Sequence, residues 1–117
     1  MVPRQRSAIK RPACQHIEDP AHEKFVSAAS LWEIAIKLGL EKLRLPQPFG
    51  EVFPQQLEVN GFALLAVSCA HLNQLTALPF HHRDPFDRLL IAQAVAEGMT
   101  IVTRDPEFPK YPVNIVW

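Results

Sequence analysis

The sequence has few cysteines and no long apolar run, and these absences exclude several classes of protein. Its two cysteines, Cys14 and Cys69, form no Cys-x-x-Cys pair and no cysteine–histidine pattern with metal-ligand spacing. A zinc site is therefore not expected, and two reduced thiols are expected in preference to one disulfide. No apolar run approaches the roughly 18 residues of a membrane span. The basic N-terminal stretch lacks the apolar segment of a signal peptide, so we expect a cytoplasmic protein that has no membrane partner.

The net charge of zero conceals an uneven distribution of charge along the chain. Residues 1–11 carry four basic groups and no acidic group, so the remaining residues are net acidic by four. A net acidic body gains no general electrostatic attraction to nucleic acid. A nucleic-acid substrate would therefore need a local basic rim or bound cations.

Length and composition fit one folded domain. The 117 residues can bury a single core, and the apolar share of 48% is too high for a disordered chain. Residues 1–12 differ from the rest because they are basic, contain two prolines and show no apolar periodicity. We interpret residues 1–12 as a disordered lead-in and residues 13–117 as the domain.

Apolar periodicity and turn residues predict an alternation of strands and helices. Helices are expected at 30–42, 49–59, 68–78 and 85–97, and strands at 25–28, 62–67, 100–103 and 113–116. Each expected strand is a continuous apolar run, which is typical of a parallel sheet covered on both faces. The predicted fold class is therefore α/β, a three-layer α/β/α domain with a mainly parallel sheet. The functional crevice of such a sheet lies beyond the carboxyl ends of its strands.

Acidic residues gather at the start of an apolar helix and at the end of the next strand. The segment His-His-Arg-Asp-Pro-Phe-Asp-Arg runs into that helix and carries Asp84 and Asp87. Asp105 follows the strand expected next, and Glu33 follows the first expected strand. In a parallel sheet, Glu33, Asp87 and Asp105 lie along one edge. Carboxylates that share a site repel one another unless a cation neutralises them, and magnesium accepts such ligands while keeping waters for hydrolysis.

Each acid also has a structural interpretation. Ser30 and Glu33 have the Ser-x-x-Glu spacing of a capping box, and Asp84 stands before a proline, as an N-cap often does. Asp87 in the first helical turn suits the helix dipole, and Asp105 before a proline can form a turn. Helix caps do not require three acids to face one point. The joint placement of Glu33, Asp87 and Asp105 therefore favours a cation site. Asp84 and Ser30 are expected as helix caps.

Basic side chains flank these acids in the sequence. Arg83 and Arg104 could hold phosphates through paired hydrogen bonds. His82 could orient a phosphate, although a solvated loop histidine is the alternative. Arg88 is expected either to contact a phosphate or to lie on the helix surface. The sequence identifies no partner for His71.

The segments 26–37, 81–94 and 102–105 together resemble the PIN domain, and within it the VapC toxins of bacterial toxin–antitoxin pairs. The ending 111–117, Tyr-Pro-Val-Asn-Ile-Val-Trp, is also similar to the ending of these toxins. The resemblance covers about residues 13–117. It implies a PIN-type α/β fold and an endoribonuclease that hydrolyses RNA with Mg²⁺ or Mn²⁺. It also implies a homodimer and inhibition by a cognate VapB-type antitoxin.

By this resemblance, Glu33, Asp87 and Asp105 match the second, third and fourth acidic positions of the family. Their implied role is to hold the cation while water attacks phosphorus. The family normally begins with a central strand that ends in an Asp-Thr-His-type sequence, and its aspartate is the first metal ligand. Residues 1–12 contain neither such a strand nor an acidic residue. We therefore expect this first strand to be absent, with weak metal binding and low activity.

The residues are compatible with three functions. In the first, the chain is a VapC-type endoribonuclease whose N-terminus is truncated, frameshifted or wrongly started. In the second, it is a noncatalytic PIN-like module that binds an antitoxin or another PIN subunit. In the third, it is a structural α/β domain whose acids are caps. For the fold we predict four strands, with either a gap at the centre of the sheet or direct pairing of the first and third strands.

Overall fold

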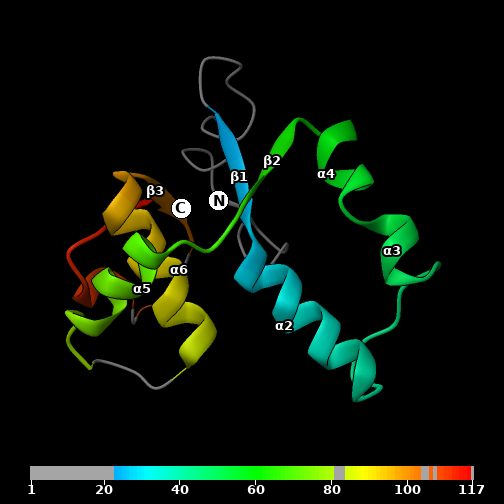
Figure 1. Ribbon diagram of the computed structural model, residues 1–117, viewed down its shortest axis with the longest axis horizontal. Helices are drawn as coiled ribbons and strands as arrows, with labels where there is room; N and C mark the ends of the chain where they lie inside the picture. The colour runs from blue at the N-terminus through cyan, green and yellow to red at the C-terminus, as the bar shows by residue number, and fades with distance from the viewer. Residues whose placement is uncertain (1–22, 81–83, 104–105, 107, 117) are drawn as a thin grey trace.

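The chain folds as an α/β domain, and the computed structural model describes residues 23–80, 84–103, 106 and 108–116. Helices alternate with short parallel strands in these residues (Figure 1), which confirms the predicted fold class. None of the helices in these ranges has the length and apolar content needed to cross a membrane.

Four short strands lie within the described ranges, at the predicted places. They are β1 (Lys24–Ser27), β2 (Phe62–Leu65), β3 (Thr100–Val102) and β4 (Asn114–Val116). β1 pairs with β2 and β3 pairs with β4, and both pairings are parallel. A parallel pair needs a crossover connection. Helices within residues 28–59 supply it between β1 and β2, and the segment that contains the 3-10 helix Phe108–Lys110 supplies it between β3 and β4.

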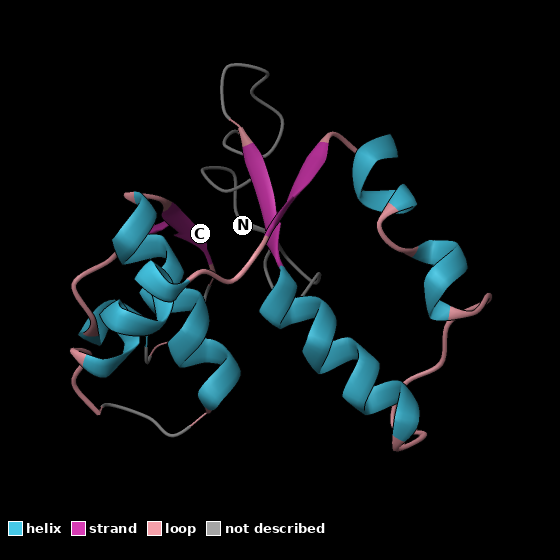
Figure 2. Ribbon diagram, in the orientation of Figure 1, coloured by secondary structure: helices cyan, strands magenta, loops and turns pink. Residues whose placement is uncertain are grey.

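The two strand pairs are separate in the part of the chain that the structure describes (Figure 2). β1 and β3 do not pair there, so the predicted alternative of direct pairing between the first and third strands is wrong. Val26 stands opposite Leu64 in the first pair, and Ile101 opposite Ile115 in the second. The prediction that residues 1–12 form no strand falls outside the described residues.

The helix α2 (Ala28–Gly39) begins directly after β1 and is capped by Ser27. The Ser27 hydroxyl accepts a hydrogen bond of 3.0 Å from the backbone N–H of Ala29. The prediction that Ser30 caps this helix is therefore wrong. An N-cap needs extended backbone, which Ser27 has at φ −71° and ψ 142°. Ser30 already lies inside the helix, because the helix starts as soon as the strand ends.

The segment 49–59, predicted as one helix, forms two short helices. They are α3 (Phe49–Val52) and α4 (Gln55–Val59). Phe53 between them is extended, with φ −116° and ψ 141°. Pro54 follows and has no N–H to donate to a continuing helix. The prediction of a single helix is therefore wrong, and the proline is the reason.

Two further helices, α5 (Cys69–Thr76) and α6 (Pro85–Glu97), pack against each other. Ser68 caps α5 and shares a reciprocal pair of hydrogen bonds with His71. α6 ends at Gly98, which has a left-handed backbone with φ 66°. Glycine adopts this conformation without steric cost because it has no Cβ.

Two apolar clusters form the core. The larger joins α6 to the C-terminal part of the chain, and its buried members are Leu78, Ile91, Ala92, Ala94, Ile101, Phe108 and Tyr111. The smaller joins β1, α2 and α4, and its buried members are Val26, Leu31 and Leu57. Leu64 of β2 is 46% exposed, so this strand is covered less completely than a three-layer arrangement predicts. α6 is the helix that connects the core to the candidate site described next.

Candidate functional site

The second turn of α2 lies in contact with the first turn of α6, and each helix carries one of the predicted acids. Trp32 of α2 packs edge-on against Phe86 of α6, with ring centroids 5.0 Å apart and an interplanar angle of 72°. Glu33 directly follows Trp32, and Asp87 directly follows Phe86. The contact therefore brings two carboxylates from distant parts of the sequence to adjoining helix turns.

Glu33 is the more accessible of the two acids. Its side chain is 16% exposed, and its Oε2 lies 3.9 Å from Nζ of Lys37, one helical turn further along α2. The Lys37 side chain is 49% exposed, and such a surface ion pair contributes little free energy.

Asp87 lies in the first turn of α6 and is 6% exposed. This end of a helix carries the positive end of the dipole, which stabilises a negative charge. Asp84 caps the same turn, because its Oδ1 accepts hydrogen bonds from the backbone N–H groups of Phe86 at 2.9 Å and Asp87 at 3.2 Å. The predicted cap role of Asp84 is confirmed. The Asp87 side chain is not required for capping.

Four predicted site residues, namely the acid Asp105 and the basic residues His82, Arg83 and Arg104, lie outside the described residues. Within the described ranges, no three acidic, histidine or cysteine side chains come together as a metal site. The described part of the site offers two carboxylates, and carboxylate oxygen is the ligand type that suits Mg²⁺ and Mn²⁺. A further carboxylate such as Asp105 would complete a set that fits such an ion.

Arg88 has a structural role that the sequence did not reveal. It is 6% exposed, and its guanidinium donates hydrogen bonds to the carbonyl oxygens of Pro79 at 2.7 Å and Leu78 at 3.4 Å. It also donates to the hydroxyl of Tyr111 at 3.4 Å and lies 4.0 Å from the ring centroid of Phe80. The prediction of a helix-surface residue is wrong, and these donors are engaged within the fold instead of facing a phosphate.

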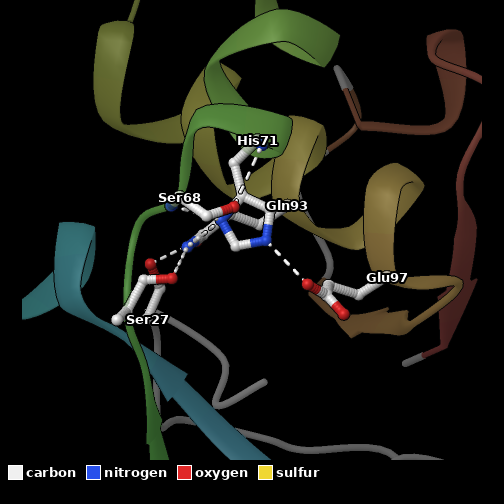
Figure 3. Close-up of polar contacts among 6 residues, drawn as sticks. Ser27, Ser68, His71, Gln93 and Glu97 are labelled. Carbon is white, nitrogen blue, oxygen red and sulfur yellow. Dashed lines mark hydrogen bonds and ion pairs between the residues drawn. The ribbon is translucent and has the colours of Figure 1, made fainter.

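A chain of buried polar groups, here named the polar chain, links the end of β1 to α5 and α6 (Figure 3). The hydroxyl of Ser27 donates to Oε1 of Gln93. Nε2 of Gln93 donates to the carbonyl of Ala66 at 3.4 Å and to Nδ1 of His71 at 3.3 Å. Nε2 of His71 donates to Oε1 of Glu97 at 2.9 Å. Ser27, Gln93 and His71 are each no more than 1% exposed.

Ser68 fixes the direction of the hydrogen bonds in the polar chain. Its backbone N–H donates to Nδ1 of His71 at 3.1 Å, so this nitrogen is an acceptor and the ring proton is assigned to Nε2. The carbonyl of Ala66 likewise requires a donor, so the amide nitrogen of Gln93 faces it. The amide oxygen is then left to accept from Ser27. Each donor named in the polar chain has an acceptor, and Nδ1 of His71 is shared between the N–H of Ser68 and the amide of Gln93.

Comparison with known proteins identifies relatives of this chain. A family model described as PIN domain matches residues 6–114. Over 55 residues the chain is 38% identical to Ribonuclease VapC16 of Mycobacterium tuberculosis (strain ATCC 25618 / H37Rv). The aligned segment covers 47% of this chain and 39% of that relative, so the chain spans well under half of the relative's length. No solved structure matches the chain.

Proposed function

We propose that this chain, which belongs to the PIN domain family, is a metal-dependent endoribonuclease of the VapC toxin type. The observation that carries the proposal is the packing of Trp32 on Phe86, next to Glu33 and Asp87. The 38% identity to a ribonuclease over 55 residues supports RNA as the substrate. We further propose that this activity takes place in the cytoplasm.

We propose that Glu33 and Asp87, together with Asp105, hold one Mg²⁺ or Mn²⁺ ion. Such an ion, when bound, supplies positive charge that polarises the phosphodiester and assists the ionisation of water. The contribution of the chain is to place the carboxylates. Glu33 and Asp87 stand on two helices whose starts are packed together, and groups on rigid elements are held more accurately than groups on loops.

The proposed RNA contacts come from the basic residues beside the acids. Arg83, Arg104 and His82 are proposed to bind backbone phosphates, because a guanidinium donates paired hydrogen bonds to phosphate oxygens. The chain after residue 11 is net acidic, so RNA gains little from its overall field. Local basic groups and the bound cation would offset this repulsion.

We also propose that these 117 residues bind the ion weakly and cleave RNA slowly. Residues 1–17 contain no acidic residue, so the sequence has no counterpart of the family's first aspartate in that segment. Loss of one carboxylate from a cation site removes both a ligand and a negative charge. Addition of an upstream strand that ends in Asp-Thr-His should therefore raise Mn²⁺ affinity and cleavage rate together.

A cleavage assay with matched variants tests the proposed function. The 117-residue chain should cleave labelled RNA with Mn²⁺, lose the activity in EDTA and regain it when Mn²⁺ is restored. Glu33→Gln and Lys37→Gln both remove the ion pair of 3.9 Å, but only the first removes the carboxylate. We expect Glu33→Gln to lower the rate by more than about 10-fold and Lys37→Gln to leave it near the wild-type rate. Equal losses in the two variants, or cleavage that EDTA does not affect, would contradict the proposal.

A second candidate function, a noncatalytic PIN-like binding module, is supported by an apolar stripe on α2. Trp32 and Ile36 lie one turn apart on α2, Leu40 is the residue at its C-cap, and Leu43 follows after the helix has ended. Their exposed fractions are 60%, 38%, 60% and 37%. Contiguous exposed apolar residues of this kind mark protein interfaces. The stripe is proposed as the surface that an antitoxin of the VapB type or a second copy of the chain covers.

Light scattering tests the stripe as an interface. If a second copy covers it, the wild type should be a dimer and Ile36→Glu a monomer. Val59→Glu is the control, because Val59 is 78% exposed and lies outside the stripe. Binding of a purified cognate antitoxin that is lost in Ile36→Glu would favour the antitoxin. Binding without any Mn²⁺-dependent cleavage, even after the upstream strand is added, would support the noncatalytic function.

A further inference from the structure

The side-chain amide of Gln93 is a polar group that is fully buried among apolar residues of α6. It lies on α6 between Ile91, Ala92 and Ala94, and all four residues are at most 1% exposed. Burial of an amide costs free energy that hydrogen bonds must offset. A leucine at this position would avoid that cost and would still fill space. The specific hydrogen bonds of the amide are therefore the feature that distinguishes it from a leucine at this position.

The Ser27 hydroxyl connects Gln93 to the first turn of α2. The same oxygen accepts a hydrogen bond from the N–H of Ala29, which starts the helix, and donates to Oε1 of Gln93. The beginning of α2 is therefore attached directly to α6. The packing of Trp32 on Phe86 attaches the following turn. Two attachments on successive turns restrict both the separation of the helices and the rotation of α2 about its axis.

His71 and Ala66 hold the other end of the Gln93 amide. Both present acceptors to its nitrogen, Nδ1 of His71 at 3.3 Å and the carbonyl of Ala66 at 3.4 Å. If the amide turned over, its oxygen would face these two acceptors and repel them. The amide oxygen is thereby kept toward Ser27, on the side of α2.

We propose that Gln93 is a positioning residue, which locks α2 against α6 and so sets the spacing of the carboxylates of Glu33 and Asp87. This inference rests on the proposed ribonuclease function, because it assigns those two acids to one cation. Gln93 touches neither the ion nor the RNA. It acts through the Ser27 cap of the helix that carries Glu33, and through the backbone of the helix that carries Asp87.

Two variants and a control test the proposal by spectroscopy, in a Trp117→Phe background where Trp32 is the remaining tryptophan. Gln93→Leu removes all hydrogen bonds of the amide. Gln93→Glu keeps the size of the side chain and its acceptor toward Ser27, but a carboxylate cannot donate to Ala66 or His71. Ile91→Val, also fully buried on α6, removes packing without touching the polar chain.

The near-ultraviolet circular dichroism and fluorescence of Trp32 should change in Gln93→Leu and also in Gln93→Glu, because a carboxylate oxygen would face the acceptors of Ala66 and His71. They should stay at wild-type values in Ile91→Val. In calorimetric titrations with Mn²⁺, Gln93→Leu should bind about 10-fold more weakly than Ile91→Val, as for residues that support metal ligands. A Trp32 signal in Gln93→Leu that equals that of Ile91→Val would overturn the proposal.

The two readouts separate this inference from the proposed function. If wild-type protein binds no Mn²⁺, the cation site fails, while the Trp32 signal still decides whether Gln93 locks the two helices. If Gln93→Leu does not fold, Gln93→Met gives the same comparison with an uncharged side chain of similar size that forms none of these hydrogen bonds. A wild-type signal and wild-type Mn²⁺ affinity in the folded Met variant would also overturn the proposal.

Discussion

Trp32 and Phe86 meet edge-to-face with ring centroids 5.0 Å apart, and each residue directly precedes a carboxylate of the candidate site. The aromatic pair joins α2 to α6, which belong to distant parts of the chain. The geometry of the two acids is therefore set by helix packing. Changes in that packing should alter the site even where no acid is replaced.

The energy of this aromatic contact can be measured with a double-mutant cycle. We predict that Trp32→Ala and Phe86→Ala are coupled by about 0.5–1.5 kcal/mol in the free energy of unfolding, because edge-to-face pairs contribute that much beyond area burial. Urea unfolding followed by far-ultraviolet circular dichroism gives the four values. Strictly additive effects would show that the two rings do not interact in solution.

Asp84 should contribute to stability as a cap, and its charge should matter little. We predict that Asp84→Ala lowers the free energy of unfolding by about 1 kcal/mol, because the hydrogen bonds of 2.9 and 3.2 Å to the first turn of α6 are lost. Asp84→Asn should remain close to the wild type, because asparagine caps equally well. Chemical denaturation of the three proteins checks both statements, and an equal loss in both variants would contradict the cap.

Local patterns in the sequence were sufficient to predict most elements and two of the caps. Asp84 before Pro85 and Gly98 after the apolar helix are signals that depend on a few adjacent residues, and the structure confirms both. The choice between Ser27 and Ser30 depends on where β1 ends. That boundary is set by pairing with β2, which is not a local property of the sequence.

The partners of buried polar side chains could not be predicted from the sequence. Arg88 meets Tyr111, and Gln93 meets Ser27 and His71, all of them distant in the chain. One signal was present, because Gln93 interrupts an apolar helix that is buried on most of its sides. A polar residue in such a run requires a partner inside the core. The identity of that partner can be read only from the tertiary fold.

Two glycines in helix-end positions should respond in opposite directions to substitution by alanine. Gly98 has φ 66° and Gly39 ends α2, and a Cβ at either position would have no atom within 4 Å. The two positions therefore differ in backbone conformation and not in the space available for a Cβ. We predict that Gly98→Ala costs about 1 kcal/mol in the free energy of unfolding, while Gly39→Ala is neutral or gains up to about 1 kcal/mol. Thermal or urea unfolding measures the change in the free energy of unfolding for both variants. A stabilised Gly98→Ala would contradict the left-handed backbone.

Arg88 should be difficult to replace even by lysine. Its guanidinium serves two carbonyls and one hydroxyl at once, and an ammonium cannot match that planar geometry. We predict a loss of about 2–3 kcal/mol in the free energy of unfolding for Arg88→Lys, because buried acceptors are left without donors. Tyr111→Phe removes the hydrogen bond that the hydroxyl accepts from Arg88 and should lose only about 1 kcal/mol. A loss in Arg88→Lys no larger than in Tyr111→Phe would show that the guanidinium hydrogen bonds to Pro79 and Leu78 contribute little to stability.

The measurement that tests the central claim most directly compares Asp87→Asn with Asp84→Asn in Mn²⁺-dependent RNA cleavage. Both substitutions remove one negative charge from the start of α6, three residues apart in the sequence. Asparagine preserves the cap at position 84, so that variant should keep the wild-type rate. Asp87→Asn should stay folded and lose more than about 10-fold in rate, because a cation ligand is removed. Equal rates in the two variants would contradict the assignment of Asp87 to the cation site.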